Sequence, residues 1–381
     1  MVHEKRIFIC AGEASGDRYG AKLAERLRAL EPGIRLTGLG GPRMSAAGVN
    51  CHIDLTQHAA MGFVTVIRKL WTFKRLLDET DRLLEQDRPN AVVLIDNPDF
   101  NLRVAAFAKK RGVKVVYYVS PQVWAWRSSR IKKIAAFVDK MLVILPFETE
   151  LYRARHVDCE YVGHPMLDYL SEAHFDERKL QDLASGEGQL VGLLPGSREQ
   201  EVSRVFPLIA RAAAQVAKNV PGVRFAVACA SQSHVESAKA SMAQAAITGG
   251  VYHDRTFEIM RSSRICIAVS GTATLELCYF GTPTVIVYRA PAYARPFRPM
   301  IKTKYIGLPN IIAGAEIMPE FLLFRPAHVP IARAATELLT NPQRRQECRR
   351  GLQGVMTKLG PPGASERAAK AILGLIADCE V

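Results

Sequence analysis

The stretch ICIAVSGTATLEL, residues 265–277, contains the pattern that decides the fold of this chain. Its first five residues are apolar and favour a β-strand that is buried on both faces. Ser270, Gly271 and Thr272 interrupt that run, and residues 273–280 then predict a helix with Thr272 as its N-cap. A strand, a turn of small residues and a helix N-terminus present free backbone N–H groups that can bind an anion. The stretch therefore predicts an α/β sheet with an anion site at its edge.

Glu276 lies one turn into that predicted helix, and two roles are open to it. Helical side chains lean toward the N-terminus, so the carboxylate can accept hydrogen bonds from a ribose while the N–H groups hold phosphates. The alternative is that Glu276 only complements the helix dipole.

Length and composition predict two globular domains and an anionic partner. The chain has 381 residues, of which 48% are hydrophobic and 23% charged, and a domain takes about 100–200 residues. The net charge of +14 favours nucleic acid, acidic lipid or a phosphorylated substrate without choosing among them. The 8 cysteines form no CxxC pair, so we expect a reducing compartment and no zinc site. We see neither a signal peptide nor an apolar run of about 18 residues, so we expect no membrane span.

The first half of the chain alternates short apolar runs with helical patterns, as a parallel α/β sheet does. We expect strands at residues 6–10, 35–38, 91–96, 114–119 and 141–145. The turn GEASGD, residues 12–17, separates the first strand from a helix expected over residues 19–30. It lacks the G-x-G-x-x-G dinucleotide pattern, but doubly wound sheets bind ligands at this position.

The stretch VLIDNPDFN, residues 93–101, places Asp96 at the end of a predicted strand. The carboxyl edge of such a sheet faces the ligand crevice, so Asp96 is a candidate general base. The alternative is that one of the two acids, Asp99 rather than Asp96, caps the helix that starts near Phe100.

The stretch AMGFVTVIRKLWTFKRLL, residues 60–77, carries more apolar surface than one core-facing stripe needs, and its only charges are basic. These properties are typical of a helix that lies in a membrane interface. The alternative is an ordinary crossover helix that packs on the sheet. The expected membrane-contacting residues are Phe63, Val66, Ile67, Lys69, Leu70, Trp71, Phe73 and Lys74.

The loop after the strand at 114–119 contains Trp124 and Trp126, followed by Arg127 and Arg130. We interpret the two indoles as a wall of the substrate cleft, with the arginines near a phosphate. The alternative is that the indoles only pack in the core.

The polar stretch 171–189 marks a domain boundary, and a second set of strands follows it. These strands are expected at residues 190–194, 224–228, 265–269 and 284–287. The first ends in the turn PGSR, where Arg198 stands before a helix expected from near Glu201. A guanidinium beside free N–H groups is a good phosphate ligand. From Pro326 onward we expect two helices, separated by the stretch KLGPPG.

Ten motifs occur in order along the chain: GEASGD (12–17), GGPRM (40–44), MGFVTV (61–66), IDNPDFN (95–101), YYVSPQVWAWR (117–127), LPFE (145–148), GHP (163–165), LLPGSR (193–198), SGTATLE (270–276) and LPN (308–310). Each is weak alone, but together they resemble the lipid-A-disaccharide synthase family over nearly the whole chain.

This resemblance implies two Rossmann-like doubly wound domains facing across a cleft, the B-type glycosyltransferase fold. We divide the chain into an N-terminal acceptor domain at 1–165, a UDP-sugar domain at 166–340 and C-terminal helices at 341–381, exchanged in a homodimer. The implied reaction transfers 2,3-diacylglucosamine from its UDP conjugate to 2,3-diacylglucosamine 1-phosphate, forming a β-1,6 linkage. It implies a peripheral protein on the cytoplasmic face of the inner membrane, with no metal and no cofactor.

The motifs also carry site residues. Asp96 matches the essential acid of the family, and Glu13 and Ser15 match its N-terminal glycine loop. The positions associated with UDP are Arg198, Glu276 and Asn310, together with the anion turn of Ser270, Gly271 and Thr272. With these partners we assign Glu276 to the ribose. Leu323 departs from the pattern, because the family commonly has Gln there.

Two rival functions share some of these features. A UDP-sugar 2-epimerase would have the same fold and UDP loop but no need of the apolar, basic segment. A basic nucleic-acid-binding protein is disfavoured because the basic residues are dispersed and no known nucleic-acid module is present.

Overall fold

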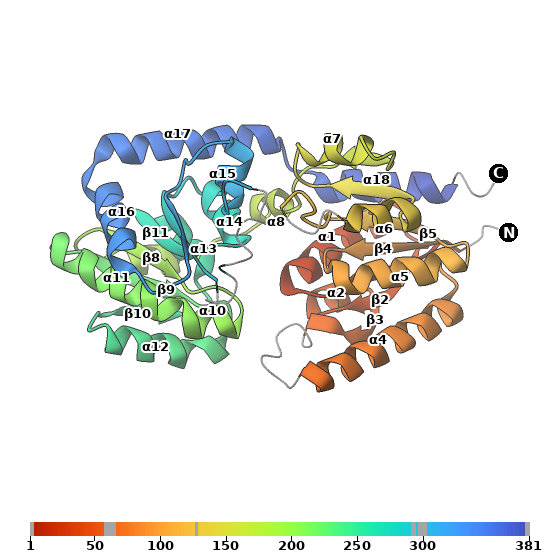
Figure 1. Ribbon diagram of the computed structural model, residues 1–381, viewed down its shortest axis with the longest axis horizontal. Helices are drawn as coiled ribbons and strands as arrows, with labels where there is room; N and C mark the ends of the chain where they lie inside the picture. Colours follow the sequence, from red (N-terminus) through yellow and green to blue (C-terminus); the bar gives the residue numbers. More distant parts are fainter. Residues whose placement is uncertain (1–3, 57–65, 126–128, 291–294, 296–302, 378–381) are drawn as a thin grey trace. The chain divides into compact units, whose positions relative to one another are not determined.

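A computed structural model describes residues 4–56, 66–125, 129–290, 295 and 303–377. The chain forms two compact units, drawn in Figure 1. Unit 1 comprises Met1–Glu172 together with Leu359–Val381, and unit 2 comprises Ala173–Lys358. The C-terminal segment therefore belongs to the unit that contains the N-terminus.

Unit 1 is built on a parallel sheet of seven strands in the order β3-β2-β1-β4-β5-β6-β7. These strands are β1 (Arg6–Ala11), β2 (Arg35–Gly40), β3 (Asn50–Asp54), β4 (Ala91–Ile95), β5 (Lys114–Tyr118), β6 (Lys140–Val143) and β7 (Cys159–Tyr161). The central strands β1 and β4 are apolar along almost their whole length, because helices cover both faces of a parallel sheet.

The helices of unit 1 are α1 (Ala14–Leu30), α2 (Pro42–Ala46), α4 (Val66–Asp87), α5 (Pro98–Lys110), α6 (Arg130–Phe137), α7 (Glu148–Arg153), α8 (Met166–Ser171) and α18 (Ala364–Ala377). Tyr117 of β5 lies in the core cluster that contains Leu77 of α4 and Phe100 of α5. Successive strand residues point to opposite faces, so Tyr118 faces the other side, where α18 packs on β5.

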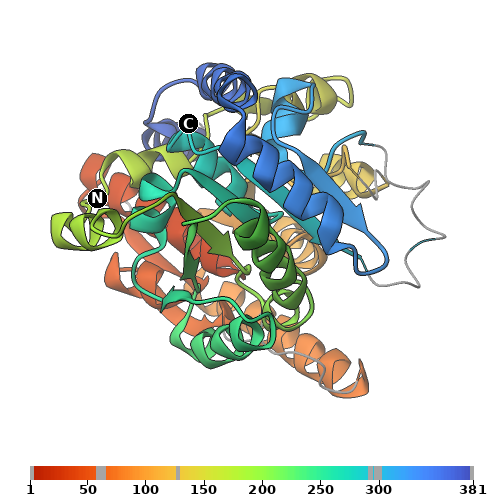
Figure 2. The ribbon, with the colours of Figure 1, turned by 90° about the vertical axis from the view of Figure 1, so that its left-hand side faces the viewer.

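Unit 2 has a parallel sheet of six strands in the order β10-β9-β8-β11-β12-β13. Its strands are β8 (Leu190–Leu194), β9 (Arg224–Ala228), β10 (Gly249–Tyr252), β11 (Ile265–Val269), β12 (Thr284–Arg289) and β13 (Glu320–Leu323). Figure 2, which turns this unit toward the viewer, shows the strands enclosed by helices. These include α9 (Glu177–Ala184), α10 (Glu199–Arg204), α11 (Phe206–Asn219), α12 (Val235–Gln244), α13 (Thr256–Ser262), α14 (Ala273–Tyr279), α15 (Leu308–Ala313), α16 (His328–Thr340) and α17 (Pro342–Leu359).

The predicted class, two α/β units with parallel sheets, is confirmed. Two local expectations are wrong. Helix α1 begins at Ala14 rather than near residue 19, because the backbone N–H of Asp17 already donates to the Glu13 carbonyl at 2.8 Å. Residues 326–377 form three helices rather than two, since the Asn341 side chain accepts from the N–H groups of Gln343 and Arg344 and starts a new helix at Pro342.

Asp168 ties α18 to unit 1. Its buried carboxylate accepts hydrogen bonds from the backbone N–H groups of Gly363, Ala364 and Ser365 at 2.6, 3.1 and 2.7 Å. These donors have no partner inside the helix, because they precede or begin it. A side chain more than 190 positions earlier in the chain therefore caps the last helix.

Replacement of Asp168 with Asn should weaken this attachment. The amide keeps only one acceptor oxygen, and a lost hydrogen bond to a buried charged group costs about 1–3 kcal/mol. We expect a lower calorimetric Tm for Asp168→Asn. The exposed carboxylate of Asp158, 3.4 Å from Lys140, provides the control: Asp158→Asn should stay within about 0.5 kcal/mol of the wild type. Equal Tm values for the two variants would contradict this role of Asp168.

Candidate functional site

Each sheet contains one point where the strand order reverses direction, and the predicted site residues follow the strands at these points. In unit 1 the point lies between β1 and β4, and in unit 2 it lies between β8 and β11. The register pairs Ala11 with Ile95, and Leu194 with Ala268, so the turns after each pair leave the same sheet edge. Ligands of open α/β sheets bind outside the carboxyl ends of the strands at such points.

In unit 1 the turn after β1 packs closely on the turn after β4. A Cβ atom on Gly12 would come within 2.2 Å of the Asn97 amide nitrogen, so a larger residue there would displace the Asn97 side chain. Glu13 occupies the N-cap position of α1, and Ser15 lies in its first turn; both side chains are half-buried. The structure thus brings Glu13 and Ser15 to the edge that carries Asp96.

Asp96 directly follows β4, and its backbone is held in the left-handed region at φ 50°. Its carbonyl oxygen accepts from the Tyr117 hydroxyl at 2.6 Å and from the Asn101 amide at 2.7 Å. These buried donors fix the strained turn and, with it, the starting direction of the Asp96 side chain. Helix α5 begins at Pro98 with Asn97 at its N-cap position, so the alternative in which Asp96 or Asp99 occupies that position is wrong.

Asp17 and Asp99, two further acids near this edge, are engaged within the protein. Asp17 is 2% exposed, and its carboxylate accepts from the N–H groups of Gly41, Arg43 and Met44 at 2.7, 3.1 and 3.1 Å. Asp99 forms an ion pair with Arg130. Both acids are thus engaged by groups of the protein itself.

Glu148 is a further candidate residue at this edge, and the sequence analysis included it only as part of the motif LPFE. Its side chain is 1% exposed and accepts from the Ser120 hydroxyl at 2.5 Å and from the Trp124 indole N–H at 3.0 Å. Burial raises the pKa of the Glu148 carboxyl to about 7, although these hydrogen bonds favour the ionised form. A carboxyl that titrates near neutrality at the carboxyl edge of a sheet is a functional candidate.

Trp124, one of the two expected wall residues, is half-buried and stacks edge-on against Phe147 at 5.3 Å. Trp126 and Arg127 lie outside the described residues. Arg130 pairs with Asp99, as noted.

In unit 2 the turn after β8 already holds an internal anion. The Glu201 carboxylate accepts from the backbone N–H groups of Ser197 and Arg198 at 3.0 and 3.2 Å and lies 3.6 Å from the Arg198 guanidinium. The Arg198 side chain itself is 60% exposed. At the position of the expected anion site, the donors are thus bound to Glu201, and α10 begins at Glu199, earlier than expected.

The turn after β11 leaves the sheet beside it. Ser270 and Thr272 are half-buried and Gly271 is exposed. Thr272 takes the expected N-cap position of α14, but its side chain makes no capping hydrogen bond, while the Thr274 hydroxyl donates to the Gly271 carbonyl at 2.7 Å. Glu276 is 8% exposed on this short helix.

Asn310 is fully buried and holds the LPN turn. Its amide donates to the Met318 carbonyl and to Glu320 at 2.8 and 3.0 Å, and its oxygen accepts from the N–H groups of Ile317 and Met318, both at 2.9 Å. Both polar atoms of Asn310 are therefore engaged within the protein. Leu323, the departure from the family pattern, is the half-buried last residue of β13.

The expected membrane segment is described only in part. Phe63 lies outside the described residues, and Val66, Ile67, Lys69 and Leu70 lie in the first turns of α4. Trp71 is 70% exposed, and Lys74 is exposed as well. Phe73 instead packs edge-on against Phe100 at 5.6 Å, beneath the guanidinium of Arg103. No helix of the described chain is long and apolar enough to cross a membrane.

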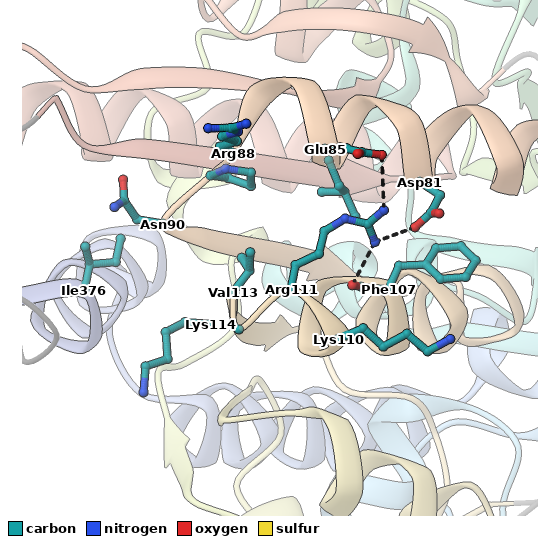
Figure 3. Close-up of a pocket in the computed structure, with 13 residues that line it drawn as sticks. Asp81, Glu85, Arg88, Asn90, Phe107, Lys110, Arg111, Val113, Lys114 and Ile376 are labelled. Carbon is teal, nitrogen blue, oxygen red and sulfur yellow. Dashed lines mark hydrogen bonds and ion pairs between the residues drawn. The ribbon is translucent and has the colours of Figure 1, made fainter.

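A pocket of about 920 Å³ lies at the opposite, amino edge of the unit 1 sheet, between α4 and α5 (Figure 3). Arg111 lies at its centre and is already paired with Asp81 at 2.6 Å and with Glu85 at 3.8 Å. Lys110 and Lys114 point in different directions rather than toward a common ligand (Figure 3). The charged groups that line this pocket therefore do not converge on a common ligand, and the carboxyl edges remain the better candidate sites.

The sequence and the fold of this chain are similar to those of known proteins. Residues 7–373 match the family model described as lipid-A-disaccharide synthetase. The lipid-A-disaccharide synthase of Geobacter metallireducens is 37% identical over 374 residues, which cover 98% of this chain and 97% of that protein. Among solved structures, the UDP-GlcNAc 2-epimerase of Neisseria meningitidis bound to UDP-GlcNAc has a TM-score of 0.65 at 11% identity, covering 98% and 100% of the two chains. MurG of Acinetobacter baumannii has a TM-score of 0.58 at 13% identity, covering 97% and 99%; these two likenesses concern the fold alone.

The titration of Glu148 should be visible in the pH dependence of stability. Its pKa is about 7 in the folded protein against 4.5 for the free side chain, so between these values the folded state binds more protons. The contribution of Glu148 to the free energy of unfolding therefore falls as the pH rises from about 4.5 to about 7. We expect the difference in Tm, wild type minus Glu148→Gln, to decrease between pH 5 and pH 8. A constant or increasing difference would contradict the assigned pKa.

Proposed function

This chain belongs to the lipid-A-disaccharide synthase family and is a glycosyltransferase, and we propose that it transfers 2,3-diacylglucosamine from UDP-2,3-diacylglucosamine to 2,3-diacylglucosamine 1-phosphate. The products are a β-1,6-linked disaccharide 1-phosphate and UDP. The observation that carries the proposal is the family match over residues 7–373, which includes both strand-order reversals and their turns. Family membership favours this function over the UDP-sugar 2-epimerase and the nucleic-acid-binding protein.

Unit 2 supplies the donor side of the proposed reaction. The diphosphate charge grows as the sugar leaves, and preorganised N–H groups and a guanidinium stabilise such charge. These donors are the backbone N–H groups of Ser197 and Arg198 and the Arg198 side chain. The turn of Ser270, Gly271 and Thr272 forms the second half of the diphosphate-binding site. The Glu201 carboxylate leaves its two N–H partners when the diphosphate binds, and Glu276 accepts hydrogen bonds from the ribose.

Asp96 of unit 1 supplies the base. The 6-hydroxyl of the acceptor attacks the anomeric carbon from the face opposite to UDP, which inverts its configuration, and Asp96 takes the hydroxyl proton. Asp96 is preferred because it matches the essential acid of the family and directly follows β4, at the carboxyl edge of the sheet. Glu13 and Ser15, beside Asp96, contact the acceptor sugar.

Both substrates carry acyl chains, so the enzyme acts at a bilayer, on the cytoplasmic face of the inner membrane. The exposed Trp71 and Lys74 at the start of α4 contact that surface, and the net charge of +14 favours anionic lipid. Phe73 contributes to the membrane contact indirectly, because it packs on α5. The protein acts as a homodimer.

Incubation of the purified protein with both substrates, followed by mass spectrometry, tests the function. The proposed transferase gives a diacylated disaccharide monophosphate and stoichiometric UDP. An epimerised UDP-sugar without disaccharide would overturn the proposal in favour of the epimerase.

Asp96→Asn should abolish most turnover and leave UDP binding intact. Loss of a positioned base typically costs about 10²–10⁴-fold in rate, and the unit 2 donors are unchanged. Initial rates and calorimetric UDP titration measure the two effects. Asp158→Asn, an exposed acid of the same unit, is the control and should keep the wild-type rate. Near-wild-type turnover of Asp96→Asn would reassign the base to Asp17 or Asp99.

Trp71→Ser should weaken binding to vesicles that contain anionic phosphatidylglycerol, because the 70% exposed indole is lost from the contact surface. We expect a reduction of about tenfold in the partition coefficient in sedimentation assays, from the loss of one interfacial aromatic side chain. Val329→Ser removes an apolar side chain that is 59% exposed in unit 2 and should leave binding unchanged. Equal binding of Trp71→Ser and the wild type would refute the membrane contact.

A further inference from the structure

The Glu148 carboxylate joins two segments that leave the same sheet edge. One oxygen accepts from the Ser120 hydroxyl and the Trp124 indole, both in the loop after β5. The other accepts from the backbone N–H of Leu145, in the turn after β6, at 3.1 Å. This carboxylate therefore holds the loop after β5, residues 119–125, against the neighbouring turn.

Further contacts hold the same loop in place. The Tyr152 hydroxyl on α7 donates to the Pro121 carbonyl at 3.3 Å, and the Trp124 ring rests edge-on against Phe147 at 5.3 Å. Val119, where the loop begins, has a φ of 66°, a costly conformation for a β-branched residue. The loop thus occupies a specific, strained conformation that its partners maintain.

The loop is directly connected to the candidate base. Tyr117, two residues before Val119, donates its buried hydroxyl to the Asp96 carbonyl at 2.6 Å. Because β5 pairs with β4 in register, Ile95 beside Tyr118, the loop leaves the sheet next to Asp96. A shift of the loop therefore changes the surroundings of the group that would take the acceptor proton.

The surroundings of Glu148 do not balance its charge. No described Lys, Arg or His forms an ion pair with it, and the titratable groups that face it are the hydroxyls of Tyr152 and Tyr161 and the Cys159 thiol. Burial raises the pKa of all three, so they are neutral near pH 7. Burying a carboxylate that has only neutral donors costs desolvation free energy. With a pKa of about 7, Glu148 changes its protonation state near neutral pH, and with it the number of hydrogen bonds that it accepts.

We propose that Glu148 is a positioning residue for the acceptor: its carboxylate fixes Ser120 and Trp124, and so the acceptor side of the site beside Asp96. The inference rests on the proposed function, which supplies the acceptor. Ionised Glu148 holds three donors, whereas the protonated form loses an acceptor position and releases part of the loop. Acceptor affinity therefore depends on Glu148, and donor affinity does not.

Two variants test this from both ends of the contact. Glu148→Gln retains the volume but offers one acceptor oxygen, and Trp124→Phe removes the indole N–H. We expect each to raise the acceptor KM about tenfold, the effect of one lost hydrogen bond to a charged group, with an unchanged Kd for UDP. Asp168→Asn, another buried carboxylate of unit 1, is the matched control: it should lower Tm without changing the acceptor KM.

A second readout does not require turnover. Tryptophan emission of the wild type, titrated from pH 5.5 to pH 8.5, should show a transition near pH 7 that both variants lose. A transition that persists in Glu148→Gln, or an acceptor KM changed no more than in Asp168→Asn, would overturn the proposal. If the wild type forms no disaccharide, the proposed function is refuted. If its emission transition is nevertheless absent from Glu148→Gln, the role of Glu148 in holding the loop is retained.

Discussion

Two pairs of adjacent parallel strands, β1 with β4 and β8 with β11, determine where the functional groups of this chain stand. Parallel pairing aligns the carboxyl ends of both strands at one edge, and the connections run away from each other there. The turns that follow are therefore free to carry chemistry. Asp96 follows β4 and Arg198 follows β8, so each candidate group depends on strand register before it depends on any side-chain contact.

Internal carboxylates then fix the turns at these edges. Asp17, Glu148 and Glu201 each accept hydrogen bonds from nearby backbone N–H groups. Such donors lie outside the sheet ladders and need partners. A carboxylate serves several of them at once, and a charged acceptor makes stronger bonds than a neutral one.

Much of the fold could be predicted from the sequence, because buried parallel strands are continuous apolar runs between turns. The central strands β1, β4, β8 and β11 were predicted, whereas the short edge strands β3, β7, β10 and β13 carry too weak a pattern. The positions of Asp96 and Arg198 at strand ends also followed from the pattern. The roles of Glu148 and Asn310 did not, because their hydrogen bonds depend on loops that only the tertiary structure brings together. The packing of Phe73 on α5 was hidden for the same reason.

The linkage and anomeric configuration of the product test the central claim most directly. Donor labelled with ¹³C at its anomeric carbon, incubated with the acceptor and the wild-type protein, gives a product whose labelled carbon can be followed by nuclear magnetic resonance. The account predicts a β linkage from that carbon to the 6-oxygen of the acceptor, with UDP released in equal amount. An α linkage, a bond to another oxygen, or a label that remains on a UDP-sugar would contradict it.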